Sequence, residues 1–136
     1  MKLGHSIELI STDGFERKFC PDDLLPHVRK EPTGVYDCQI SYTAPHNWPE
    51  FLKHGDRNRL AIWNYEYDGT KLLQGFAKFH HAADVVLPSS NFTKRVFTNM
   101  GIPEENMVVV PHGINLEDFE SKKTTTLRTK KRHKIL

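Results

Sequence analysis

The segment from residue 60 to residue 110 alternates short apolar runs with helical patterns, and this alternation restricts the fold more than any other feature of the chain. Short apolar runs predict strands at residues 60–65, 84–87 and 107–110. Apolar residues that recur at helical spacing predict helices over residues 70–83 and 91–100. Short, wholly apolar strands that alternate with helices are typical of a parallel sheet covered on both faces. We therefore expect an α/β fold with a Rossmann-like parallel sheet.

The second of these helices has well-marked ends. Ser89, Ser90 and Asn91 supply N-cap candidates at its start. Gly101 can take the left-handed position after its last turn, and Pro103 follows. These signals predict helix boundaries close to residues 91 and 100.

The first sixty residues are less regular. Apolar residues predict strands at residues 5–11 and 36–42, whereas Pro21, Pro26 and Pro32 exclude a long helix between them. Residues 44–59 are rich in proline and glycine and predict a loop with one helical turn near residues 49–53. At the other end of the chain, residues 133–136 could begin one more strand.

The segments that follow the predicted strands are the natural place for a binding site. In an open parallel sheet, ligands bind at the carboxyl ends of the strands, which all meet at one edge. The segments concerned are residues 43–48, 66–70, 89–91 and 112–115.

An ordered set of motifs between residues 83 and 119 resembles one enzyme family. A strand ends in Pro88-Ser89 and leads into a helix, and Gly101-Ile102, an acidic turn and a valine-rich strand follow. The run closes on Pro111-His112-Gly113-Ile114-Asn115, with Phe119 a few residues on. In this order and spacing, the motifs resemble the GT-B glycosyltransferases, especially the large retaining group (family 4, or group 1) that uses nucleotide-diphosphate sugars.

The resemblance extends upstream to nearly the whole chain. Gly4-His5 and the strand after it resemble the family's second strand, and residues 61–66 resemble a strand that ends in an acidic residue. The resemblance implies that residues 1–120 form the N-terminal, acceptor-side domain, with the family's first strand and glycine-rich loop lying before Met1. It also implies that residues 121–136 form a basic interdomain linker and the start of a missing C-terminal donor domain.

The resemblance implies an enzyme that moves a sugar from a nucleotide-diphosphate sugar to a hydroxyl group of a sugar, glycolipid or glycan acceptor. Such an enzyme has no tightly bound cofactor or metal, and it holds the donor mainly through its C-terminal domain in cis. We therefore expect the chain alone to be inactive, and to be marginally stable or self-associating. The full-length enzyme would be cytoplasmic, or peripheral to a membrane.

The candidate substrate-binding residues share positions just after predicted strands, and they are Glu66, Ser89, Ser90, Asn91, His112, Gly113 and Asn115. The two serines could offer hydroxyl and N–H groups to a sugar or phosphate, or they could only cap the helix. Glu66 could accept hydrogen bonds from sugar hydroxyls. Gly113 could adopt a conformation costly for other residues, allow close approach of a ligand, or lie in a plain hinge. His46 is the candidate catalytic residue, with an exposed or structural histidine as the alternative.

Composition argues against several other classes. A chain of 136 residues suits one modest domain, and its net charge of +2 is too small to indicate nucleic-acid binding. No apolar run reaches the roughly 18–20 residues of a membrane span. Cys20 and Cys38 are too few to staple a secreted fold, so we expect free thiols, with a single disulfide between them as the alternative. His80 and His81 are adjacent and should point in different directions from a helix, so we expect no metal site.

Two other interpretations remain open at the level of sequence. The first is a stand-alone Rossmann-like binding module, which a Gly-x-Gly-x-x-Gly fingerprint would support, and the sequence contains none. The second is a protein that binds nucleic acid or lipid through the basic residues 122–134, whose plainer interpretation is a solvated linker.

Overall fold

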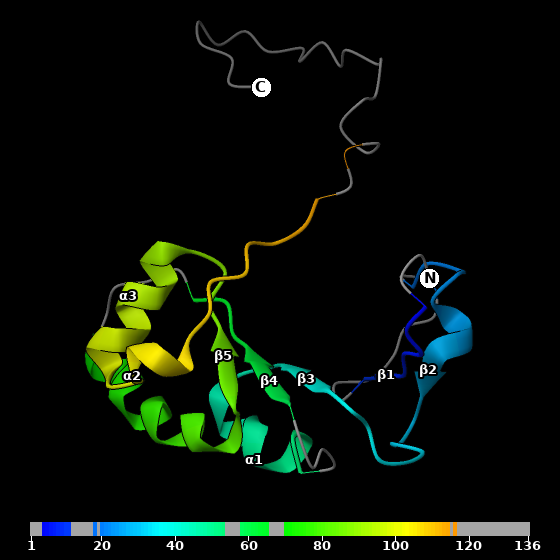
Figure 1. Ribbon diagram of the computed structural model, residues 1–136, viewed down its shortest axis with the longest axis horizontal. Helices are drawn as coiled ribbons and strands as arrows, with labels where there is room; N and C mark the ends of the chain where they lie inside the picture. The colour runs from blue at the N-terminus through cyan, green and yellow to red at the C-terminus, as the bar shows by residue number, and fades with distance from the viewer. Residues whose placement is uncertain are drawn as a thin grey trace, which may run out of the picture.

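Two small parallel sheets organise a mixed α/β fold in the computed structural model, which describes residues 4–11, 18, 20–53, 58–65, 70–114 and 116. The first sheet pairs β1 (Leu9–Ile10) with β2 (Val28–Arg29). The second holds β3 (Gln39–Tyr42), β4 (Arg59–Ile62) and β5 (Val85–Leu87) in that order. In Figure 1 the first sheet lies on the right and the second in the middle of the molecule.

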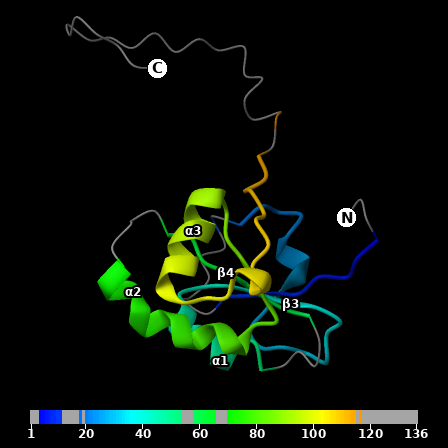
Figure 2. The ribbon, with the colours of Figure 1, turned by 60° about the vertical axis from the view of Figure 1, so that its left-hand side comes forward.

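Three α-helices follow the strands of the second sheet, one after each strand, and cover one of its faces. They are α1 (Trp48–Phe51), α2 (Thr70–Ala77) and α3 (Asn91–Met100). Short 3-10 helices complete the connections: η2 (Leu25–His27), η3 (Pro45–Asn47), η4 (Lys78–Ala82) and η5 (Glu104–Asn106). Figures 1 and 2 both show the three α-helices together on one side of the second sheet.

The core lies between these helices and the sheet. The register aligns Ser41, Ala61 and Val86, and Val86 bridges to Met107, so four buried residues form a row on the helix-facing side. Large side chains fill the space above this row, and Trp48 and Phe97 are both fully buried. Burial of a side chain the size of Phe contributes roughly 1.5–3 kcal/mol.

The predicted boundaries of α3 are confirmed. Ser90 is the N-cap, and its Oγ accepts a hydrogen bond from the Thr93 N–H at 3.1 Å. Gly101 has a φ of 103°, and its N–H donates to the Thr98 carbonyl at 3.0 Å while the Ile102 N–H donates to the Phe97 carbonyl at 3.1 Å. This pair of bonds is a Schellman motif, which satisfies carbonyl groups at the end of the helix.

The strands are parallel as expected but shorter than the apolar runs that predicted them. The strand expected over residues 5–11 is only Leu9–Ile10, and the one expected over residues 60–65 ends at Ile62. Residues 107–110 form a parallel bridge and two hydrogen bonds, Val108 N to Val86 O at 3.1 Å and Val110 N to Pro88 O at 3.0 Å, rather than a full strand. The Met107 N–H is still committed to the Glu104 carbonyl of η5, at 3.1 Å, and cannot join a ladder.

Other differences lie in the connections. The helical turn expected near residues 49–53 begins at Trp48, because η3 runs directly into it. The helix expected over residues 70–83 becomes 3-10 after Ala77 and ends at Ala82. The pair η2 and β2 was not predicted, since it lies in the proline-rich stretch. The predicted linker and the strand at residues 133–136 lie outside the described residues.

The second face of the β3–β5 sheet carries apolar side chains that no described helix covers. The register aligns Ile40, Leu60 and Val85 in one row and Tyr42, Ile62 and Leu87 in the next. Val108 and Val110 extend this face beyond β5, because their side chains alternate with that of buried Met107. We call these eight residues the open face. The expected helices on both faces are therefore found on one face only in the described part of the chain.

Candidate functional site

The carboxyl ends of neighbouring strands bring three polar side chains together. Tyr42 is the last residue of β3, Asn64 lies two residues beyond β4, and His112 lies two residues beyond the segment that pairs with β5. The Asn64 Nδ2 donates to the Tyr42 Oη at 2.5 Å, and the His112 Nε2 lies 2.9 Å from the Asn64 Oδ1. The Tyr42 and His112 rings meet edge to face, with centroids 6.5 Å apart. We call these three residues the edge network.

The hydrogen bonds of the edge network determine which groups it can offer to a ligand. Because the Asn64 amide nitrogen donates to Tyr42, its carbonyl oxygen must accept from His112, so the proton of a neutral His112 is on Nε2. The Nδ1 of His112 is then an acceptor, and the Tyr42 hydroxyl still has its own proton to donate. All three residues are exposed. The network therefore offers a donor and an acceptor close together, which is the complement of a hydroxyl group.

Ser90 lies after β5 and acts as a helix cap, as the plainer interpretation predicted. Its Oγ lies 3.0 Å from the Thr93 Oγ1, in addition to accepting from the Thr93 backbone. The Thr93 hydroxyl in turn lies 3.4 Å from the Tyr65 carbonyl oxygen, to which it donates. These bonds hold the start of α3 against the chain that leaves β4. Substrate contact by Ser89, Ser90 and Asn91 stays a prediction.

His46 lies on the helix-covered side of the sheet. Its ring packs on Phe76 of α2 with centroids 5.7 Å apart, and Phe76 packs on Trp63 at 5.6 Å. Asn64 lies on the other side, because it alternates with the core-packed Trp63 along the chain. The described contacts do not join His46 to the edge network, so its catalytic role stays a prediction.

The structure corrects the expectation for Gly113. Among the described glycines, Gly4 and Gly101 have a positive φ and Gly113 does not. A Cβ added at Gly113 would meet no heavy atom within 4 Å. The chain leaves the sheet here without a tight turn, so neither backbone conformation nor crowding within the protein requires glycine. Glu66 and Asn115, the other two candidates, lie outside the described residues.

The two adjacent histidines do not point apart, contrary to expectation. The His80 and His81 rings are tilted against each other with centroids 3.8 Å apart, in the tight turn η4 rather than an α-helix. The His80 Nδ1 lies 2.6 Å from the Ala77 carbonyl. Within the described residues, no group of three or more His, Cys, Asp or Glu could hold a metal ion.

Two further findings concern the state of the cysteine thiols and the search for membrane-spanning helices. Cys20 and Cys38 are free thiols, as predicted. None of the helices in the described part of the chain combines the length and apolar character needed to cross a membrane.

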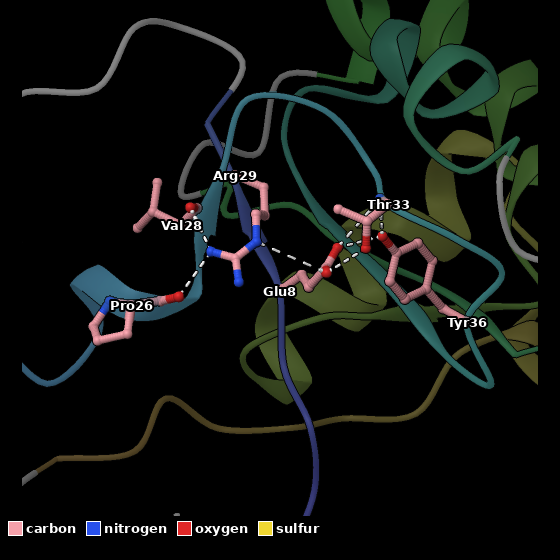
Figure 3. Close-up of polar contacts among 6 residues, drawn as sticks. All are labelled: Glu8, Pro26, Val28, Arg29, Thr33 and Tyr36. Carbon is pink, nitrogen blue, oxygen red and sulfur yellow. Dashed lines mark hydrogen bonds and ion pairs between the residues drawn. The ribbon is translucent and has the colours of Figure 1, made fainter.

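A second polar cluster surrounds Glu8, just before β1 (Figure 3). The Thr33 hydroxyl donates to Oε1 and the Tyr36 hydroxyl to Oε2, each at 2.5 Å, and the Arg29 Nε lies 4.0 Å from Oε1. The hydrogen bond from Thr33, followed by that from Tyr36, holds the pKa of the Glu8 carboxyl below its usual value. Both oxygens are engaged by the protein itself, so this cluster is a structural tie between β1 and the segment that leads to β3.

An ion pair between Arg59 and Asp84 holds β4 to β5 at the amino edge of the sheet. The Arg59 Nη2 lies 2.7 Å from the Asp84 Oδ1, its Nε 3.3 Å from Oδ2, and its backbone N–H donates to Oδ2 at 2.8 Å. These bonds from Arg59 lower the pKa of the Asp84 carboxyl, and the same pairing raises the pKa of Arg59. The pair lies at the opposite end of the strands from the edge network and is structural.

Sequence reasoning predicted His112 as a site residue but missed Tyr42 and Asn64 as its partners. One signal was present for Asn64. It is polar between two aromatic residues, Trp63 and Tyr65, just where a predicted strand ends. That alternation places it on the opposite side from the core. Asn64 and His112 lie 48 positions apart in the sequence, so no local sequence pattern could reveal that they pair.

Comparisons of this chain with models of protein families, with curated proteins and with solved structures find no match.

Proposed function

We propose that this chain is the acceptor-side half of a GT-B glycosyltransferase that uses nucleotide-diphosphate sugars. The edge network is the observation that supports the proposal most, because it gathers hydroxyl-complementary groups at the carboxyl edge of a parallel sheet. The ordered motifs of residues 83–119 support the same conclusion. The other half, which would hold the donor, would be a C-terminal domain in cis.

In the parent reaction, the bond between the sugar's anomeric carbon and the donor's diphosphate oxygen breaks. A new bond forms between that carbon and an acceptor hydroxyl oxygen, and the proton of that hydroxyl passes to the departing nucleotide diphosphate. The edge network would bind the acceptor by donating from Tyr42 and accepting at His112 Nδ1, with Asn64 holding both in place. Such positioning brings an acceptor oxygen into reactive geometry, which is a large part of catalysis in bimolecular reactions.

Sugar binding to the isolated chain tests the proposal. We expect titration with glucose, mannose, galactose and N-acetylglucosamine, followed by amide NMR shifts, to perturb the residues around Tyr42, Asn64 and His112 with at least one of these sugars. Replacing Asn64 with Ala removes the residue that orients the other two, so binding should weaken roughly tenfold, about the value of one or two hydrogen bonds.

The matched control is Asn99→Ala, an exposed asparagine on α3, which should leave sugar binding unchanged. Shifts that map to the basic tail, or equal weakening by both variants, would contradict the proposal.

A further inference from the structure

The edge network keeps its hydrogen bonds whether or not the His112 ring carries an extra proton. The His112 Nε2–H donates to the Asn64 Oδ1 at 2.9 Å, and the Asn64 Nδ2 in turn donates to the Tyr42 Oη. Both nitrogens of a protonated imidazole are donors, so Nε2 makes the same bond in either state. Protonation therefore changes the network only at the His112 Nδ1.

No group in the described part of the chain competes for that nitrogen. The His112 Nδ1 makes no hydrogen bond among the described residues, and His112 is exposed. Its described neighbours are Asn64, which does not titrate, and Tyr42 of β3, whose phenol ring meets it edge to face. None of the ion pairs between described residues includes His112. A proton taken up at Nδ1 is therefore available to a ligand.

Uptake of that proton exchanges the acceptor of the edge network for a donor. With a neutral His112, the network offers the Tyr42 O–H as donor and Nδ1 as acceptor, the pair that complements a hydroxyl group. With a protonated His112, it offers two donors and a positive charge. Two neighbouring donors complement a carboxylate, which has two oxygens and only accepts, and charge-assisted bonds of this kind are the stronger ones.

We propose that the edge network has a second ligand class, the carboxylates of acidic sugars, which it binds when His112 is protonated. This inference rests on the proposed function, because it assigns a sugar to the same three residues in both states. Histidine is the side chain that changes charge between about pH 5 and pH 8, so the preference of the site should shift within that range. The site would select neutral acceptors in neutral solution and uronic acids in mildly acidic solution.

Glucose and glucuronate are a matched pair of probes, because they differ only in a hydroxymethyl group and a carboxylate. Between about pH 8 and about pH 5, we expect amide NMR titrations to show glucose affinity falling and glucuronate affinity rising. The ratio of glucuronate to glucose affinity should rise roughly tenfold. Glucuronate stays ionised throughout, because carboxyl groups titrate near pH 4 or below.

The same coupling can be measured on the histidine itself. Ligand binding and protonation are linked, so each ligand changes the protonation of His112 by as much as protonation changes its affinity. Saturating glucuronate should move the midpoint pH of the His112 ring signals upward, and glucose should move it downward. A histidine with a purely structural role would show neither change.

The variant His112→Gln replaces the titrating ring with a neutral amide. The ratio of glucuronate to glucose affinity should then no longer change with pH. The matched control is His5→Gln, an exposed histidine ahead of β1, which should keep the full change. A ratio that still changes in His112→Gln would assign the effect to another group and overturn the proposal.

The possible outcomes separate this proposal from the proposed function. Glucose binding with an affinity ratio that does not change with pH overturns the second ligand class and leaves the acceptor site intact. Glucuronate binding at about pH 5 without glucose binding at any pH supports the carboxylate class and contradicts a site for neutral acceptors. Binding of neither sugar overturns both. Acetate that perturbs the same amides as strongly as glucuronate would show that the site does not recognise an acidic sugar.

Discussion

Glu8 binds three neighbours from two different segments, and its ionisation should therefore control how firmly the first sheet is held. The Thr33 and Tyr36 hydroxyls donate to its two oxygens, while Arg29 of β2 approaches one of them. A carboxylate that accepts such bonds is favoured over its protonated form, which explains the lowered pKa of Glu8. The cluster joins β1, β2 and the segment before β3 through one charge.

We predict that Glu8→Gln flattens the acid dependence of stability. Since the pKa of Glu8 is lower in the folded state, its contribution is complete above the unfolded pKa, roughly 4.3, and is lost as pH falls through the lower folded value. Urea denaturation at several pH values between 3 and 7 would measure this. Glu50→Gln, an exposed glutamate of α1, is the control and should keep the acid dependence of the unchanged chain.

The second prediction concerns how much the Arg59–Asp84 pair contributes to stability. Asp84→Ala removes a two-point contact with the guanidinium group and leaves the Arg59 N–H without its acceptor. Both side chains are about a third exposed or more, so solvent screens the pair, and we predict a loss of about 1 kcal/mol in unfolding free energy. Glu105→Ala, on the exposed side of η5, should change stability much less, and equal losses in the two variants would count against this account.

At the scale of elements, α3 shows which parts of the fold local sequence can specify. Its N-cap and its left-handed C-terminal residue are each recognisable from the residue itself, so both boundaries were predictable. The ends of the strands were not, because an apolar run does not say where a hydrogen-bonding partner stops. Residues 63–65 show this well: Trp63 and Tyr65 pack on the core although β4 has already ended at Ile62.

The caps of α3 lead to the third prediction. Ser90→Ala should cost about 1 kcal/mol of unfolding free energy, because the Thr93 N–H loses its acceptor. Ser90→Asp should retain most of the stability, since aspartate caps equally well and suits the helix dipole. Thermal denaturation of both variants would check this, with Ser89→Ala as the control one residue away. An equal loss in Ser89→Ala would mean that the effect is not capping.

At the scale of the whole molecule, the sequence was sufficient to predict the parallel α/β arrangement. It was not sufficient to predict which faces of the sheet the helices cover. Alternating apolar and helical patterns predicted β4, α2, β5 and α3 in order. They did not reveal that the helices of the β3–β5 sheet all lie on one face, because the same pattern suits a sheet covered on one side or on both. The edge network was predictable only at His112, since its other contacts depend on how the strands are arranged.

The fourth prediction concerns the chain as a whole, and it is a negative one. We expect no transfer of sugar and no measurable binding of UDP-glucose, GDP-mannose or related donors by calorimetric titration. The transfer needs donor and acceptor held together, an effect of roughly 7–11 kcal/mol in favourable cases, and the proposed half supplies only the acceptor side. Saturable one-to-one binding of a donor near micromolar concentration would show that the chain has a donor site of its own.

The order of strands in the second sheet has a consequence for how the chain folds during synthesis. Each strand pairs with the next one along the chain, from β3 through β4 and β5 to residues 107–110. Every new strand–helix unit that leaves the ribosome therefore finds its docking surface already made, and no strand has to wait for a distant one. Each pairing then closes a loop of only one strand–helix unit, which limits the entropy cost of bringing the two strands together. We expect the sheet to assemble progressively from β3 onward.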